Sequence, residues 1–134
     1  MRPITFPYIS LHGKCPAPII LLELKGPLGW KEMIAYVDSG ASFSIFSINE
    51  ASRLGIEYTS GKELMVTVGD GSFIPVYLHR LSVKISHISF KATIGFSPRL
   101  GVGFNLLGRK DIFEQFDVTF SDSRRTVAFS PHAE

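Results

Sequence analysis

The sequence predicts an all-β domain, closed or nearly closed as a barrel, with one or two short helices. Two observations lead to this prediction. The 134 residues include 11 Phe, 12 Gly and 8 Pro, a composition typical of packed strands joined by tight turns rather than of a helical bundle. Short apolar or alternating runs also recur between turn residues, which is the pattern of strands that bury one face or both.

The length of the chain corresponds to one domain, which can bury a core without disulfides or a structural metal. Residues 1–18 are rich in proline and have no clear hydrophobic period. We therefore expect an N-terminal arm or edge segment there, and a single domain over residues 19–134.

The first strands are expected at residues 19–25 and 32–37, joined by a turn that contains Gly26, Pro27 and Gly29. A helix should begin after Ser47, because Glu50 stands three positions later, as a capping box requires. Ile48, Ala51 and Leu54 fall on one face of this helix, which is expected to be buried. Gly55 is expected to end the helix.

The rest of the chain is predicted to be mainly strands. They are expected at residues 64–68, 73–78, 81–85, 90–96, 104–107, 116–120 and 126–129, with a loop at residues 97–103 and a turn at residues 121–125. A second and shorter helix is expected at residues 109–115.

The tetrapeptide Asp38-Ser39-Gly40-Ala41 is the motif that carries chemistry. An isolated Asp-Ser-Gly is common, and it often marks only a turn after a strand. Here the preceding strand is apolar, so the carboxylate lies where the chain leaves the core. Ser39 and Gly40 permit a tight turn whose hydroxyl and amide groups can hold that carboxylate.

Three segments of the chain together resemble the retropepsin-like aspartic proteases, in particular their compact bacterial members. Val37-Asp38-Ser39-Gly40-Ala41 is similar to the active-site loop of that family. The other two segments are Val68-Gly69-Asp70-Gly71-Ser72, similar to the flap hairpin that closes over substrate, and Leu106-Leu107-Gly108-Arg109, similar to the apolar-apolar-Gly segment beside the active-site loop. The resemblance covers roughly residues 19–130 and rests on the order and spacing of the segments. It implies a retropepsin-like (acid protease) barrel in which Asp38 is catalytic and Ser39, Gly40 and Ala41 support its loop.

The chain departs from the family pattern in several places. Val68 stands where bilobal pepsins have a flap Tyr. Ser42 occupies the position at which viral members often have an Asp that pairs with the Arg of the apolar-Gly segment, so Arg109 needs another partner. The expected C-terminal hairpin also differs from the short terminal strand by which viral subunits interlock.

Amide hydrolysis by carboxylates needs one group that takes a proton from water and another that gives one to the carbonyl oxygen. The chain has a single Asp-Ser-Gly motif, and none of the other Asp residues lies in such a loop: Asp70, Asp111, Asp117 and Asp122. A second Asp38 must then come from a second subunit across a two-fold axis. The sequence therefore predicts a homodimeric aspartic endopeptidase, in which the resemblance assigns Ser39 to hydrogen bonds across that axis. An extended peptide or protein substrate would lie between flap and dyad.

Other function classes are less compatible with the sequence. The histidines and the single cysteine show no metal-ligand spacing, so neither a metal nor a cofactor is expected: His12, His79, His87, His132 and Cys15. The net charge is only +2, and basic and acidic residues are interleaved along the chain, which argues against nucleic-acid binding. The apolar run at residues 19–22 is too short to span a bilayer, and no secretion signal is evident, so a cytoplasmic protein is expected.

The alternative that stays open is a dimeric peptide-binding or assembly module that keeps the fold without useful turnover.

Overall fold

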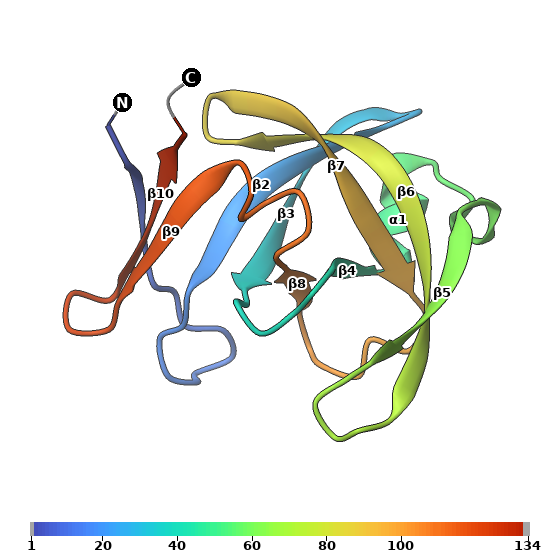
Figure 1. The fold of residues 1–134 in the computed structure, drawn as a ribbon, viewed down its shortest axis with the longest axis horizontal. Coiled ribbons are helices and arrows are strands. Elements are labelled where there is room, and N and C mark those ends of the chain that lie inside the picture. Colours follow the sequence, from blue (N-terminus) through green and yellow to red (C-terminus); the bar gives the residue numbers. More distant parts are fainter. Residues whose placement is uncertain (1, 133–134) are drawn as a thin grey trace.

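The structure, a computed structural model, describes residues 2–132, so the first residue of the predicted arm and the last two of the predicted domain lie outside the described residues. Its strands form two sheets (Figure 1). The larger sheet contains, in spatial order, β2 (Ile19–Gly26), β3 (Gly29–Val37), β8 (Asn105–Leu107), β4 (Ser44–Ser47), β7 (Ile88–Ser97), β6 (Phe73–Ile85) and β5 (Lys62–Thr67). Because β2 also pairs with β6, six strands close into a barrel, and β5 extends from β6 as the outer strand of a hairpin. The predicted all-β barrel is confirmed.

The barrel closes around an apolar core to which its strands contribute buried side chains. In β2, the side chains of Ile20, Leu22 and Leu24 are at most 2% exposed, whereas Leu21 between them is 50% exposed. Phe46 and Phe96 are the largest side chains that the neighbouring strands β4 and β7 bury completely. In β2 this alternation directs one face of the strand inward and leaves Leu21 to solvent, whereas β4 buries three successive residues.

The smaller sheet contains β1 (Ile4–Pro7), β10 (Thr126–Pro131) and β9 (Phe116–Ser121), all antiparallel. β1 belongs to the predicted arm, and here it is an edge strand that pairs with β10 of the same chain (Figure 1). Phe6 packs edge-on against Phe129, with ring centroids 5.8 Å apart, and Phe129 packs in the same way against Phe116. An aromatic cluster therefore fastens the N-terminal strand to the C-terminal hairpin.

The predicted first helix is present as α1 (Ile48–Leu54), followed by the 3₁₀ helix η1 (Tyr58–Ser60). Gly55 ends α1 in the left-handed conformation, with φ of 78°, which a residue without Cβ adopts at little cost. The predicted capping box is wrong, because Ser47 makes no side-chain capping hydrogen bond and Glu50 bonds to other groups. Among residues 2–132, no helix is long and apolar enough to cross a membrane.

Three other details of the prediction also differ from the structure. The strands expected at residues 73–78 and 81–85 are parts of the single strand β6, and the short strands β1 and β4 were not predicted. The helix expected at residues 109–115 is wrong, since this segment forms successive turns. Asp111 has a φ of 65°, which an α-helix does not accept.

Asp111 is held in this conformation by contacts to the barrel. Its Oδ2 atom accepts hydrogen bonds from the Thr93 N–H and from the Arg80 guanidinium, both at 2.8 Å. Burial acts to raise the pKa of Asp111, but the hydrogen bonds from Thr93 and the positive charges of Arg80 and Lys110 outweigh it, so the pKa lies below its usual 3.8. These contacts fasten the turns at residues 109–115 to β6 and β7.

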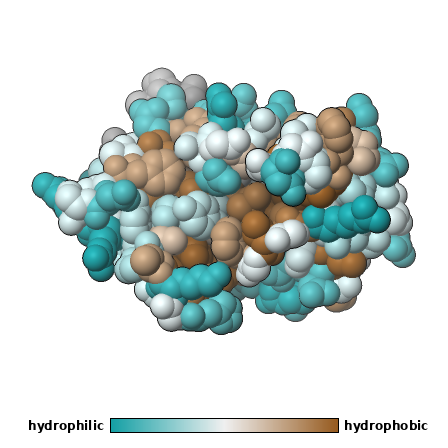
Figure 2. Space-filling view, turned by 90° about the horizontal axis from the view of Figure 1, so that it is seen from below, coloured by the Kyte–Doolittle hydropathy of each residue, from teal (hydrophilic) through white to brown (hydrophobic). Residues whose placement is uncertain are grey.

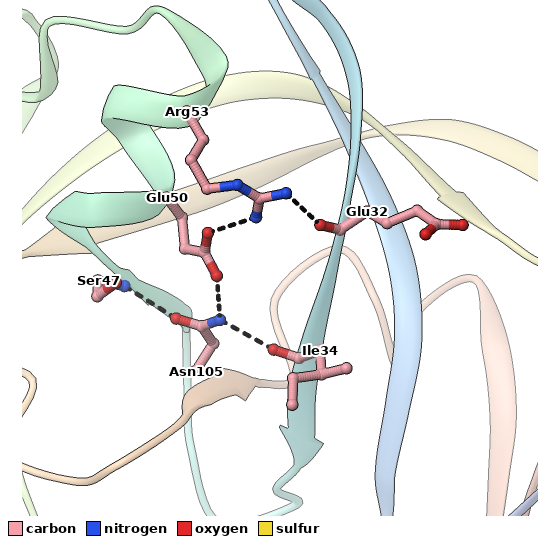
Figure 3. A network of polar contacts seen from close by, with 6 residues as sticks. All are labelled: Glu32, Ile34, Ser47, Glu50, Arg53 and Asn105. Atoms are coloured by element: carbon pink, nitrogen blue, oxygen red, sulfur yellow. Dashed lines mark hydrogen bonds and ion pairs between the residues drawn. The ribbon is translucent and has the colours of Figure 1, made fainter.

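A second polar network connects β8, β3 and the start of α1 (Figure 3). Asn105 is 6% exposed. Its side-chain oxygen accepts a hydrogen bond from the Ser47 N–H at 3.0 Å, and its nitrogen donates to the Ile34 carbonyl at 2.9 Å and to Glu50 at 3.0 Å. Arg53 then links Glu50 to the backbone of β3 by donating to the Glu32 carbonyl. The network fixes how β3 and β8 lie beside each other.

We predict that Asn105→Ala lowers the free energy of unfolding by about 2 kcal/mol or more, because the Ser47 N–H and the Ile34 carbonyl lose their partner inside the protein. Urea denaturation followed by circular dichroism measures this change. The matched control is Asn49→Ala, an exposed Asn on α1, which should change stability much less. Equal effects of the two substitutions would contradict the structural role of Asn105.

We predict that Asp111→Asn lowers stability at pH 7 by about 1 kcal/mol, because a charge-assisted hydrogen bond becomes a neutral one while the side chain still tolerates positive φ. A carboxyl whose pKa is lowered by folding stabilises the fold above its unfolded-state pKa and loses that contribution as the pH falls through the folded-state value. The difference between wild type and variant should therefore shrink below pH 3.8. Thermal unfolding at several pH values checks this, and a difference that is constant with pH would contradict it.

Candidate active site

Asp38 lies at the point where β3 leaves the barrel core. The preceding residue, Val37, is 1% exposed, and Asp38 itself is partly exposed. The Asp38 N–H donates to the Leu107 carbonyl at 3.0 Å, and its Oδ1 atom accepts a hydrogen bond from the Gly40 N–H at 2.9 Å. Among residues 2–132, no hydrogen bond reaches Oδ2, so one carboxylate oxygen is held by the loop and the other can bind a further group.

Residues 107–110 pass close beside this loop. The Gly108 N–H donates to the hydroxyl of buried Ser44 at 3.0 Å, and the Arg109 and Lys110 N–H groups donate to the carbonyls of Ala41 and Ser42, both at 2.9 Å. A Cβ on Gly108 would collide with the Phe43 carbonyl group, so the passage requires glycine. The predicted apolar-Gly segment and Asp38 loop thus form one hydrogen-bonded unit.

A cavity of about 560 Å³ opens beside Asp38. Its walls come from the Asp38 loop, the β5–β6 hairpin and the loop that precedes β8: Tyr36, Asp38, Gly40, Ala41, Ser42, Phe43, Ile45, Val66, Thr67, Val68, Gly69, Leu100, Val102, Phe104 and Leu106. Figure 2 views the molecule from below, the side on which Figure 1 places the tip of this hairpin, and shows apolar surface gathered in the middle of that face. Among the described residues that line the cavity, Asp38 is the one carboxylate. The cavity therefore suits an apolar ligand that presents a polar group to Asp38.

The predicted flap segment forms the tip of the β5–β6 hairpin. The Val68 N–H donates to the Ser72 carbonyl at 2.9 Å, and Gly71 turns the chain with a φ of 86°. Asp70 accepts hydrogen bonds from the hydroxyl and the N–H of Ser72, and these bonds lower the pKa of Asp70 below its usual value. Val68 and Gly69 line the cavity, whereas Asp70, Gly71 and Ser72 lie beyond it.

The remaining predicted site residues lie around the cavity rather than in it. Ser39 is exposed and lines a smaller depression of about 240 Å³ that also adjoins Asp38, together with Tyr8 and Asp122. The Tyr8 hydroxyl donates to Asp122 at 2.8 Å, and burial together with this carboxylate raises the pKa of Tyr8 to about 12. Arg109 is exposed and does not line the main cavity. The structure thus gathers the loop, the hairpin and Leu106 around one space and places Ser39 and Arg109 outside it.

Several residues of the site were not predicted. Tyr36 lines the cavity and stacks on Phe104, with ring centroids 5.2 Å apart. It stands two residues before Asp38 in an extended segment, so the two-residue period of a strand places both on one face and could have identified Tyr36. Ser44 and Asn105 carry no such local signal, because their partners are distant in sequence. In the described part of the chain, no group of three or more metal-ligating side chains lies close enough to hold a metal ion.

Comparisons with known proteins identify the fold of the chain. No protein-family profile and no curated protein matches the sequence. Among solved structures, a retropepsin-like aspartic protease from Rickettsia conorii aligns with a TM-score of 0.67 and 19% identity, covering 96% of this chain and 98% of that one. The EIAV protease in complex with an inhibitor aligns with a TM-score of 0.56 and 17% identity, covering 79% of this chain and 92% of that one. The chain therefore adopts the retropepsin-like fold.

Proposed function

We propose that the chain is one subunit of a homodimeric aspartic endopeptidase, in which two Asp38 carboxyls, one from each subunit, activate a water molecule that attacks a peptide bond. One observation carries this proposal: among the described residues that line the apolar cavity, Asp38 is the one carboxylate, and one of its oxygens is held by its own loop. The retropepsin-like fold, which the two solved aspartic proteases share, supports the same chemistry.

The dimer is part of the proposal because one carboxyl cannot carry out both proton transfers. One group must remove a proton from the water while another protonates the carbonyl oxygen of the substrate. Two carboxyls in contact share a single proton, since the two negative charges repel each other. A two-fold axis beside Asp38 would provide the second carboxyl from an identical loop. Ser39 is exposed and does not line the main cavity, which is compatible with a contact to that second loop.

The substrate in this proposal is an extended peptide between the β5–β6 hairpin and Asp38. An extended chain can pair its backbone with the hairpin and place alternate side chains in the cavity. The side chains available to meet them are apolar and come from the hairpin and from the loop before β8: Val66, Val68, Leu100, Val102 and Phe104. We therefore expect apolar residues next to the bond that is cleaved.

We predict that Asp38→Asn abolishes peptide cleavage but not peptide binding. The amide has nearly the volume of the carboxyl but cannot act as a general base, a role worth on the order of 10² to 10⁴ in rate. Purified wild type and variant are compared in a digest of a mixed peptide library and, with any peptide that is cleaved, in a binding assay. Light scattering should show both proteins at twice the subunit mass.

The outcomes of this comparison are distinct. Equal cleavage by both proteins would show that Asp38 is not catalytic. Absence of cleavage by both, with peptide binding retained, would instead identify the chain as a binding module. A fully active monomer would contradict the two-subunit mechanism.

We predict that cleavage by the wild type follows a bell-shaped dependence on pH with its maximum below pH 7. The pair of carboxyls must hold one proton, and the two limbs of the bell belong to the pair rather than to either subunit. Initial rates with one peptide across buffers of equal ionic strength provide the profile. A rate that rises continuously into alkaline pH would argue against a carboxylate pair.

A further inference from the structure

A second depression, of about 480 Å³, adjoins the main cavity on the side of Arg109 and Lys110. Ser42 and Phe43 line both spaces, so a chain that occupies the main cavity can continue into the second. The two spaces differ in character. The main cavity is largely apolar, whereas the second carries two cationic side chains between aromatic walls.

The backbone of Arg109 and Lys110 is held in position relative to the Asp38 loop. Their backbone N–H groups donate to the carbonyls of Ala41 and Ser42, which follow Asp38 in the same loop. The positions at which Arg109 and Lys110 leave the backbone therefore cannot move independently of the Asp38 loop. Both charges therefore stay close to any ligand that is placed against Asp38.

Both cations are available to a ligand. Among residues 2–132, neither side chain forms an ion pair or a hydrogen bond, and both residues are exposed. Two acids lie nearby: Glu114, which lines the same depression and accepts a hydrogen bond from the Asp111 N–H at 2.9 Å, and Asp111, which pairs with Arg80 at 2.8 Å. Ser42, which lines the same depression, carries no charge.

The surroundings favour recognition of a carboxylate. Phe43 and Phe113 line the same depression, and apolar walls reduce the screening of a charge by water. The guanidinium of Arg109 can bind a carboxylate through two parallel hydrogen bonds, and the ammonium of Lys110 adds a second positive charge. Glu114 also lines the depression and offsets part of this charge, which leaves one net positive charge among its side chains.

We infer that Arg109 and Lys110 select substrates with a Glu or Asp side chain a few residues from the cleaved bond. This inference rests on the proposed peptidase function and specifies its substrate class. An extended peptide advances about 3.3 Å per residue, so a substrate held at Asp38 reaches the adjoining depression within a few residues. The aspartic dyad then acts on a bond between apolar residues, while the acidic residue fixes the register of the peptide.

The test uses peptide pairs that are identical except for Glu or Gln at one position, scanned along both sides of the cleaved bond. At one or two positions, the wild type should show a kcat/KM for the Glu peptide on the order of 10-fold above that for the Gln peptide, and added salt should reduce this ratio. In the double variant Arg109→Gln and Lys110→Gln the ratio should fall toward one. The control is Lys62→Gln with Lys91→Gln, which removes the same charge from exposed strand positions that line neither space and should keep the wild-type ratio.

The binding of the same peptide pairs to Asp38→Asn separates this inference from the proposed function. If the wild type cleaves nothing while Asp38→Asn still binds Glu peptides in preference to Gln peptides, and the preference disappears on replacing Arg109 and Lys110, the peptidase proposal fails and the acidic recognition stands. Equal kcat/KM values and equal binding affinities for the Glu and Gln peptides at every position would overturn the inference. A double variant that loses its dimeric mass would also overturn it, because the cations would then serve the contact between subunits.

Discussion

The close passage of residues 107–110 beside the Asp38 loop is the constraint on which the rest of the site depends. Four hydrogen bonds join the two segments, and the separation between them leaves no room for a side chain at Gly108. The same passage holds the backbone of Asp38 and directs Arg109 and Lys110 into the adjoining depression. Catalytic chemistry and substrate selection, as proposed, therefore share one rigid backbone arrangement.

Two polar networks hold this passage at its ends. Asn105 fixes the strand that enters it, and Asp111 fixes the turns that leave it. In the part of the chain that the structure describes, no buried side-chain nitrogen or oxygen lacks a hydrogen-bond partner. Satisfied polar groups in an apolar core favour one arrangement over its alternatives, since any shift would leave a group unpaired. Such a scaffold suits a site whose second half is proposed to come from an identical subunit.

The local sequence pattern was sufficient to predict the barrel and the turn that forms the Asp38 loop, because both depend on short-range signals. The apolar runs that alternate with turn residues, and the turn residues after Val37, are visible without knowledge of the fold. The errors occur where distant residues decide the local structure. Asn105 lies 55 residues from Glu50 and 71 from Ile34, and its bond to Glu50 replaces the expected capping box. The positive φ of Asp111, which excludes a helix at residues 109–115, likewise accompanies contacts to β6 and β7 that no local pattern reveals.

The central claim is that two copies of Asp38 act together, and mixing subunits tests it most directly. Wild type and Asp38→Asn are unfolded together, refolded in varied proportions at constant total concentration, and assayed for cleavage. If the active unit needs an Asp38 from each subunit and subunits assort at random, activity falls as the square of the wild-type fraction, to about one quarter in an equal mixture. Activity that falls in direct proportion, to about one half, would mean that each subunit works alone and would contradict the account.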